Sequence, residues 1–195
     1  ADNAVFTLPA DFTIEFWFFQ TGAFQDRLII DKWTEYYVYT RANGVIGLAW
    51  GPYNPSGMFG VGGIVQSGSN GFALNTWTHV AVSRTGTSLK LFINGVNDGS
   101  VTTSATPTMG GSDVTHIGCT SYSLISNRAF TGNISNLRVV KGTGLYSSNF
   151  TPSTTPLTAI SGTQLLTCQS NRFLDNSSNA LTVSVATGTP SVQRF

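Results

Sequence analysis

The chain has 195 residues and a formal net charge of +1, and 10% of its residues are charged, 41% hydrophobic and 12% aromatic. This length suffices for one large domain with its own core, and the apolar content argues against an intrinsically disordered chain. The ten basic residues lie singly and no apolar run reaches the ~18 residues of a membrane span, so the sequence indicates no nucleic-acid partner and no membrane segment.

Short β-branched and aromatic runs recur between Gly, Asn, Ser and Pro, whereas helical periodicity is hard to find. The first run, Phe12–Gln20 ("FTIEFWFFQ"), is apolar on nearly both faces, which is typical of a strand covered on both sides in a layered structure. The start of the chain, "ADNAVFTL", shows no signal-peptide pattern and resembles an interior piece of a longer protein.

The stretch "EYYVYTRANGVIGLAW" predicts a β-hairpin with the arms Glu35–Arg41 and Val45–Trp50, because Asn-Gly pairs tolerate the positive φ of tight turns. Tyr37 and Tyr39 share one face of the first arm with the charged ends of that arm. Tyr36 and Val38 take the other face. The first face is too polar for a core, so we expect it at the protein surface.

A second antiparallel pair is predicted within "WTHVAVSRTGTSLKLFINGV", where the apolar residues alternate on both sides of a polar loop. The Asn-Gly pairs that begin at Asn43, Asn70 and Asn94 predict tight turns. Further on, Ile134 and Leu137 are three residues apart, so both point inward only if a β-bulge near Ser135–Asn136 absorbs the extra residue. The tail offers two more strands, around Gln164–Cys168 and Ala180–Val185.

The count of about a dozen short strands predicts an all-β fold, a two-sheet antiparallel β-sandwich, with residues 1–195 as a single domain. Several apolar residues of these strands are expected to be largely buried. They are Trp17, Val80, Val82, Leu91, Ile93, Ile134 and Leu137.

Three blocks of the chain carry a family resemblance: "FTIEFWFF", "WTHVAVSRTGTSLKLFINGV" and "FTGNISNLRVVKGTGLYSSNFTP". Their order resembles the laminin-G-like branch of the concanavalin A-like lectin/glucanase superfamily. The third block, with "LLTCQSNRFLDNSSN", is similar to laminin-G-like domains in virion proteins of marine bacteriophages. The resemblance implies a concanavalin A-like jelly roll that often serves as a carbohydrate-binding or adhesion module.

The superfamily includes glucanases, whose retaining members need two carboxyl groups about 5–5.5 Å apart. The laminarinase-type pattern Glu-x-Asp-x-x-Glu is absent, so we predict that the protein is not an enzyme. Glu15 lies within an apolar strand and is either a site carboxylate or, as we favour, the partner of a basic group or of backbone donors. Cys119 and Cys168 are either bridged or two separate thiols.

The resemblance also implies calcium as a candidate cofactor, because sandwiches of this family often hold it at a rim through Asp or Asn side chains. The candidate metal ligands are Asp98, Asp113 and Asp175, each in a Gly- or Asn-rich turn. Asp and Asn also cap their own loops, so ordinary turn chemistry is the alternative reading of all three positions.

Sugars stack their C–H faces on aromatic rings and exchange hydrogen bonds with amides, Arg and acids. The densest aromatic region lies in "DKWTEYYVYTRANGVIGLAWGPYNPSG". It predicts a ligand site made of Trp33, Tyr37, Tyr39, Arg41, Trp50, Tyr53 and Asn54. The alternative is that these aromatics cover a sheet edge or pack on its outer layer.

Together these observations predict a non-catalytic carbohydrate-binding or adhesion module, extracellular or on the surface of a phage virion, at its tail or capsid. Its partner would be a glycan or a host-surface polysaccharide. The alternative is a structural virion decoration or assembly protein that binds other virion proteins and not sugar, for which a contiguous apolar patch is expected.

Overall fold

A computed structural model describes residues 4–32, 35–50, 63–68, 71–107, 114–120, 128–186 and 188–191. A short 3₁₀ helix, η1 (Ala4–Phe6), precedes the strands. One sheet has six strands in the order β11 (Thr163–Thr167), β10 (Gly132–Lys141), β1 (Phe12–Gln20), β6 (Thr78–Thr85), β7 (Ser88–Ile93) and β8 (Val96–Thr102). The other has five, in the order β5 (Gly63–Gln66), β4 (Ile46–Trp50), β3 (Tyr36–Thr40), β2 (Arg27–Lys32) and β9 (His116–Ile117).

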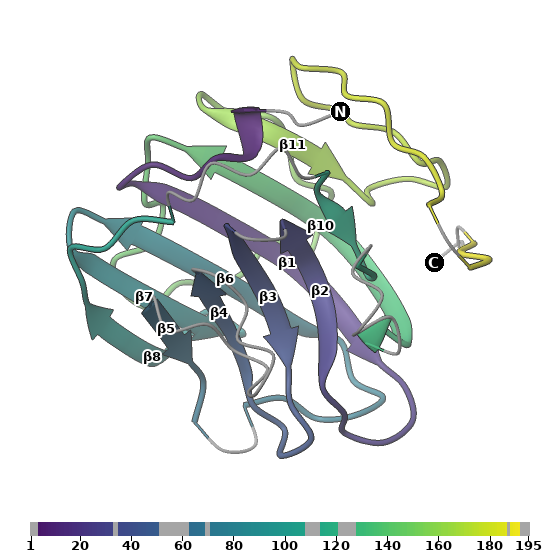
Figure 1. Ribbon diagram of the computed structural model, residues 1–195, viewed down its shortest axis with the longest axis horizontal. Helices are drawn as coiled ribbons and strands as arrows, with labels where there is room; N and C mark the ends of the chain where they lie inside the picture. Colours follow the sequence, from purple (N-terminus) through teal and green to yellow (C-terminus); the bar gives the residue numbers. More distant parts are fainter. Residues whose placement is uncertain are drawn as a thin grey trace.

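The two sheets lie face to face, with the five-stranded sheet in front of the six-stranded one in Figure 1. All strand pairs within the sheets are antiparallel. The predicted all-β sandwich is therefore confirmed. Among the described residues, no helix has the length and apolar character of a membrane span.

The core lies between the sheets and is built from alternate residues of each strand. On β1 the four inward side chains are fully buried: Phe12, Ile14, Phe16 and Phe18. They pack in one cluster with residues from β3 and β4, which include Tyr36, Val38, Ile46, Leu48 and Trp50. Burying apolar surface on this scale is the main force that holds the two sheets together.

None of the residues that we expected to be largely buried is classed as exposed, and all but Trp17 face the core. Val80, Val82, Leu91 and Leu137 have no exposed surface, and Ile93 and Ile134 pack, partly buried, against the core. Trp17 is likewise partly buried, but it lies on the outer face of the six-stranded sheet and not in the core. Its indole N–H donates there to the carbonyl of Ser153 at 3.0 Å.

The predicted bulge in β10 is confirmed. Glu15 lies opposite Arg138, but Trp17 lies opposite Ser135, so two residue steps on β1 face three on β10. The additional residue is accommodated at Asn136, which has a positive φ of 51°. The bulge turns Ile134 and Leu137 to the same side of the sheet.

The Asn94–Gly95 pair forms the predicted tight turn between β7 and β8. Both residues have positive φ, 50° and 79°, as a type I′ turn requires. Gly95 also lies close to a neighbouring segment, because a Cβ at this position would come within 1.9 Å of the carbonyl oxygen of Phe150.

The tail after β11 differs from the prediction. β11 was expected and is present, but residues 180–185 form no strand. In Figure 1 the tail (yellow) loops beside β11. The side chain of Asp175 accepts hydrogen bonds from the backbone N–H groups of Leu166 in β11 and Leu181 in the tail. The carboxylate therefore accepts the N–H of β11 that the carbonyl of a neighbouring strand would otherwise accept. That all 195 residues form one domain stays a prediction.

Candidate functional site

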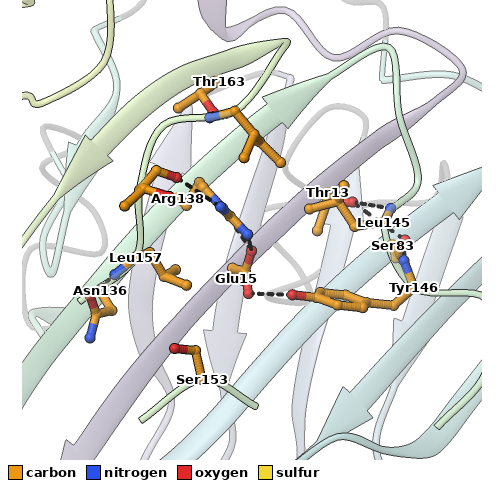
Figure 2. Close-up of polar contacts among 12 residues, drawn as sticks. Thr13, Glu15, Ser83, Asn136, Arg138, Leu145, Tyr146, Ser153, Leu157 and Thr163 are labelled. Atoms are coloured by element: carbon orange, nitrogen blue, oxygen red, sulfur yellow. Dashed lines mark hydrogen bonds and ion pairs between the residues drawn. The ribbon is translucent and has the colours of Figure 1, made fainter. Parts of the chain in front are cut away.

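Glu15, the acid within the apolar strand β1, is buried at the centre of a polar cluster on the outer face of the six-stranded sheet (Figure 2). Its Oε1 accepts hydrogen bonds from Nε and Nη2 of Arg138 at 2.9 and 2.5 Å. Its Oε2 accepts the phenolic O–H of Tyr146 at 2.8 Å, and Nε2 of His79 lies 3.5 Å from the same oxygen. The predicted pairing of Glu15 with a basic group is confirmed.

The charge state of Glu15 follows from these partners. Burial by itself would raise the pKa of the carboxyl group. The hydrogen bond with His79, the charge and hydrogen bonds of Arg138, and the phenol of Tyr146 outweigh burial, so the pKa lies below its ordinary value. Burial and, next to it, the Glu15 carboxylate raise the pKa of Tyr146, so the phenol stays a hydrogen-bond donor.

Residues 143–158, which we call the strap, cross the outer face of the six-stranded sheet and close over this cluster. Side chains of the sheet bind the strap's backbone: Thr13 accepts from the N–H of Leu145 at 2.9 Å, and Ser83 accepts from the N–H of Tyr146 at 3.1 Å (Figure 2). Arg138 also donates to the carbonyl of Thr158 at 2.9 Å. The cluster therefore fastens the strap, and Glu15 is not presented to a substrate.

The outer face of the five-stranded sheet carries the tyrosines of the predicted ligand site. The rings of Tyr37 and Tyr39 lie 5.8 Å apart. Both side chains are buried, with exposed fractions of 6% and 0%, so the expectation that they lie at the surface is wrong. Small residues of β4 explain part of this burial, since a Cβ at Gly47 would come within 2.8 Å of the Tyr39 hydroxyl.

The remaining predicted ligand residues do not come together on this face. Trp50 alternates with the outer-face residues of β4 and is buried in the core, where the guanidinium of Arg84 lies 5.7 Å from its ring. Arg41 is half-buried after β3. Glu35, expected at the surface, is buried and accepts a hydrogen bond from Lys32. Trp33, Tyr53 and Asn54 lie outside the described residues.

The calcium candidates that the structure describes have protein partners. Asp98 accepts a hydrogen bond from the N–H of Gly68 at 2.9 Å. Asp175 accepts four hydrogen bonds, from Leu166, from Leu181, and from both the N–H and the hydroxyl of Ser177. Asp113 lies outside the described residues. Within the part of the chain that the structure describes, no three His, Cys, Asp or Glu side chains group as metal ligands.

The two cysteines are separate thiols. Neither Cys119 nor Cys168 forms a disulfide, and both are partly buried. Burial raises the pKa of the Cys168 thiol, which disfavours the thiolate form that reacts with electrophiles.

A pocket of about 460 Å³ opens at one end of the sandwich, and the sequence did not reveal it. Its walls come from the loop between β1 and β2, from the segment before β6 and from the turn between β7 and β8. The lining residues are Phe24, Gly71, Phe72, Ala73, Leu74, Thr76, Thr78 and Asn94. Because three segments distant in sequence form it, no local motif could have indicated it.

Two antiparallel sheets packed face to face, with a strap across one outer face, define a jelly-roll β-sandwich of the lectin type. Residues 1–143 match the laminin G family model of the concanavalin A-like lectin/glucanases superfamily, and the chain belongs to this superfamily. No curated protein sequence is significantly similar to the chain.

Solved structures share the fold at low sequence identity. A candidate carbohydrate-binding protein from Bacteroides ovatus superposes with a TM-score of 0.67 at 14% identity, over 92% of this chain and 52% of that one. The chain thus spans about half the length of that protein. The CBM40 module of the Ruminococcus gnavus IT-sialidase, bound to α2,6-sialyllactose, has a TM-score of 0.55 at 14% identity, over 72% of this chain and 80% of the module.

Proposed function

We propose that the chain is a non-catalytic carbohydrate-binding module. The observation that carries the proposal is the pocket at the end of the sandwich, which joins aromatic walls, Phe24 and Phe72, to the hydroxyl and amide groups of Thr76 and Asn94. This combination suits a sugar, whose ring has apolar faces and a polar rim. The fold shared with the sialyllactose-binding module of Ruminococcus gnavus supports the same class of ligand.

The absence of catalysis is part of the proposal. A retaining glycosidase needs one carboxyl group as acid and a second as nucleophile, both facing the sugar. Glu15 is fastened under the strap by Arg138 and Tyr146. Among the described residues that line the pocket, none is an acid.

A glycan array probed with the purified, folded chain tests the binding proposal. We expect binding to a limited set of glycans that free sugar of the same structure competes away. Binding to no glycan would contradict the proposal. Release of reducing sugar from β-glucans, lost on substitution of one particular acid, would contradict the non-catalytic part.

The finer proposal is an adhesion role outside the cell or on the surface of a phage virion, toward a host-surface polysaccharide. It rests on the resemblance of the block from Phe130 to Pro152 and of the tail block to laminin-G-like domains of phage virion proteins. The test is to probe intact virions with an antibody against the chain, and we expect the antibody to label them. Absence of the chain from purified virions would contradict it.

A structural decoration role is the second candidate, and exposed apolar residues in the tail favour it. Phe173 and Leu174 are 39% and 44% exposed, and such surface often marks contacts with another protein. Light scattering separates the two roles. A monomer that binds a glycan supports adhesion, whereas a stable oligomer that is indifferent to sugars supports decoration.

A further inference from the structure

We propose that the pocket at the end of the sandwich binds one neutral hexose residue, with the side-chain N–H₂ of Asn94 donating to a sugar hydroxyl and the ring of Phe24 stacking on a C–H face. This inference rests on the proposed carbohydrate-binding function and names its site and its ligand class. The fold alone shows neither that the ligand is a sugar nor where the ligand binds, because sandwiches of this type have many functions.

The aromatic wall of the pocket is held rigidly. Phe72 is 5% exposed and packs edge-on against Phe18 of the core, with ring centroids 5.0 Å apart. Phe24 in turn packs edge-on against Phe72, at 5.2 Å, and is only half-buried. A partly exposed ring fixed by a core ring offers a pre-organised stacking surface, which lowers the entropy lost on binding.

The amide of Asn94 has a defined orientation. Its Oδ1 accepts a hydrogen bond from the backbone N–H of His79 at 2.9 Å. The backbone N–H of Asn94 donates to the carbonyl of His79 at 2.8 Å, so both ends of this contact hold the residue in place. The Nδ2 donors therefore point away from this contact, and within the described part of the chain they have no partner. A fixed donor at the rim of a pocket with apolar walls is suited to a sugar hydroxyl.

The charge of the pocket selects the ligand class. Its described lining contains no Lys, Arg, His, Asp or Glu side chain. An acidic sugar would give up part of its hydration without gaining a cation, which costs free energy. The volume of about 460 Å³ lies near the lower end of the range for small-ligand pockets, which fits one sugar ring. We therefore expect a neutral hexose and not a sialic acid.

NMR titration of the ¹⁵N-labelled chain tests the inference. The probes are the methyl glycosides of glucose, galactose and mannose, with the methyl glycoside of N-acetylneuraminic acid as the acidic counterpart. At least one neutral glycoside should shift the side-chain N–H₂ signals of Asn94 and the backbone signals of Gly71 and Ala73. The acidic glycoside should leave these signals unchanged.

Three variants of the intact chain complete the test. Asn94→Asp keeps the acceptor for His79 and the turn, but removes the donor, so binding should weaken by about tenfold. Phe24→Ala removes the stacking ring and should weaken binding by a similar factor. Phe173→Ala removes an exposed phenylalanine in the tail and should bind like the wild type. Circular dichroism verifies that each variant is folded.

The outcomes separate the site from the function. Some glycans could bind on the array but shift other signals, with an affinity that survives both Asn94→Asp and Phe24→Ala. That result would overturn the pocket as the binding site and would leave the chain a carbohydrate-binding module. Signals shifted only by the acidic glycoside would overturn the ligand class. Binding to no glycan at all would overturn the proposed function and this inference together.

Discussion

Nε of Arg138 lies 2.9 Å from Oε1 of Glu15, and the two residues face each other across the neighbouring strands β10 and β1. Both are buried, and the strap closes over them. A buried ion pair of this kind is expensive to break, because removal of one partner leaves the other charge without compensation. The pair therefore links the stability of the sheet to the attachment of the strap.

Replacement of Glu15 by Gln should lower the free energy of unfolding by about 3 kcal/mol, since the guanidinium of Arg138 stays buried without its counter-ion. Urea denaturation followed by tryptophan fluorescence measures the loss. The matched control is Asp26→Asn, which removes a partly exposed ion pair with Arg128 but keeps an acceptor for Ala42. The control should lose less than about 1 kcal/mol, and equal losses would contradict the role given to Glu15.

The pH dependence of the protein's stability should also show the contribution of the Glu15 carboxylate. Because the folded-state pKa of Glu15 lies below the ordinary value of 4.5, its contribution is present above that pH and is lost as the pH falls through the lowered pKa. The melting temperature of the wild type should therefore fall more steeply on acidification than that of Glu15→Gln. Parallel curves for the two proteins would show that Glu15 titrates as in the unfolded chain.

Gly95 and Gly86 test the contact between the β7–β8 turn and the strap. Both have positive φ, but a Cβ at Gly95 would clash with the carbonyl of Phe150, whereas Gly86 has open space around it. Gly86→Ala should cost about 1 kcal/mol from backbone strain alone. Gly95→Ala should cost about 2–4 kcal/mol, because the strap must also move. Thermal unfolding of the two variants checks the difference.

Much of the fold could be predicted because it depends on local spacing. The three-residue interval between Ile134 and Leu137 was enough to locate the bulge, and the Asn-Gly pair was enough to locate the turn at Asn94. The prediction of a strand at residues 180–185 was wrong, because the side chain of Asp175 binds β11 in place of such a strand. An apolar alternation does not reveal that a side chain will take over backbone hydrogen bonds.

The candidate site was harder to predict, because burial depends on residues from other strands. Tyr37 and Tyr39 share a face with Glu35, which looked too polar for burial. Glu35 instead pairs with Lys32, and Gly47 leaves room for the Tyr39 ring. Trp50 illustrates the reverse case, since it lies two residues after Leu48 on β4 and therefore shares the core-facing side of that strand.

Asp175→Ala should release the tail from β11. The carboxylate accepts from the N–H groups of Leu166, Ser177 and Leu181, so amide hydrogen exchange at these three positions should accelerate, while exchange in β6 stays slow. Asp98→Ala is the matched control, because Asp98 accepts one exposed hydrogen bond from Gly68 and lies on β8, at the opposite edge of the six-stranded sheet from β11.

The same experiment tests calcium at Asp175. Each of its oxygens already accepts two protein donors, so a chelator should leave exchange in the wild-type tail unchanged. Faster tail exchange in the chelator, reversed by added calcium, would instead make Asp175 a metal ligand.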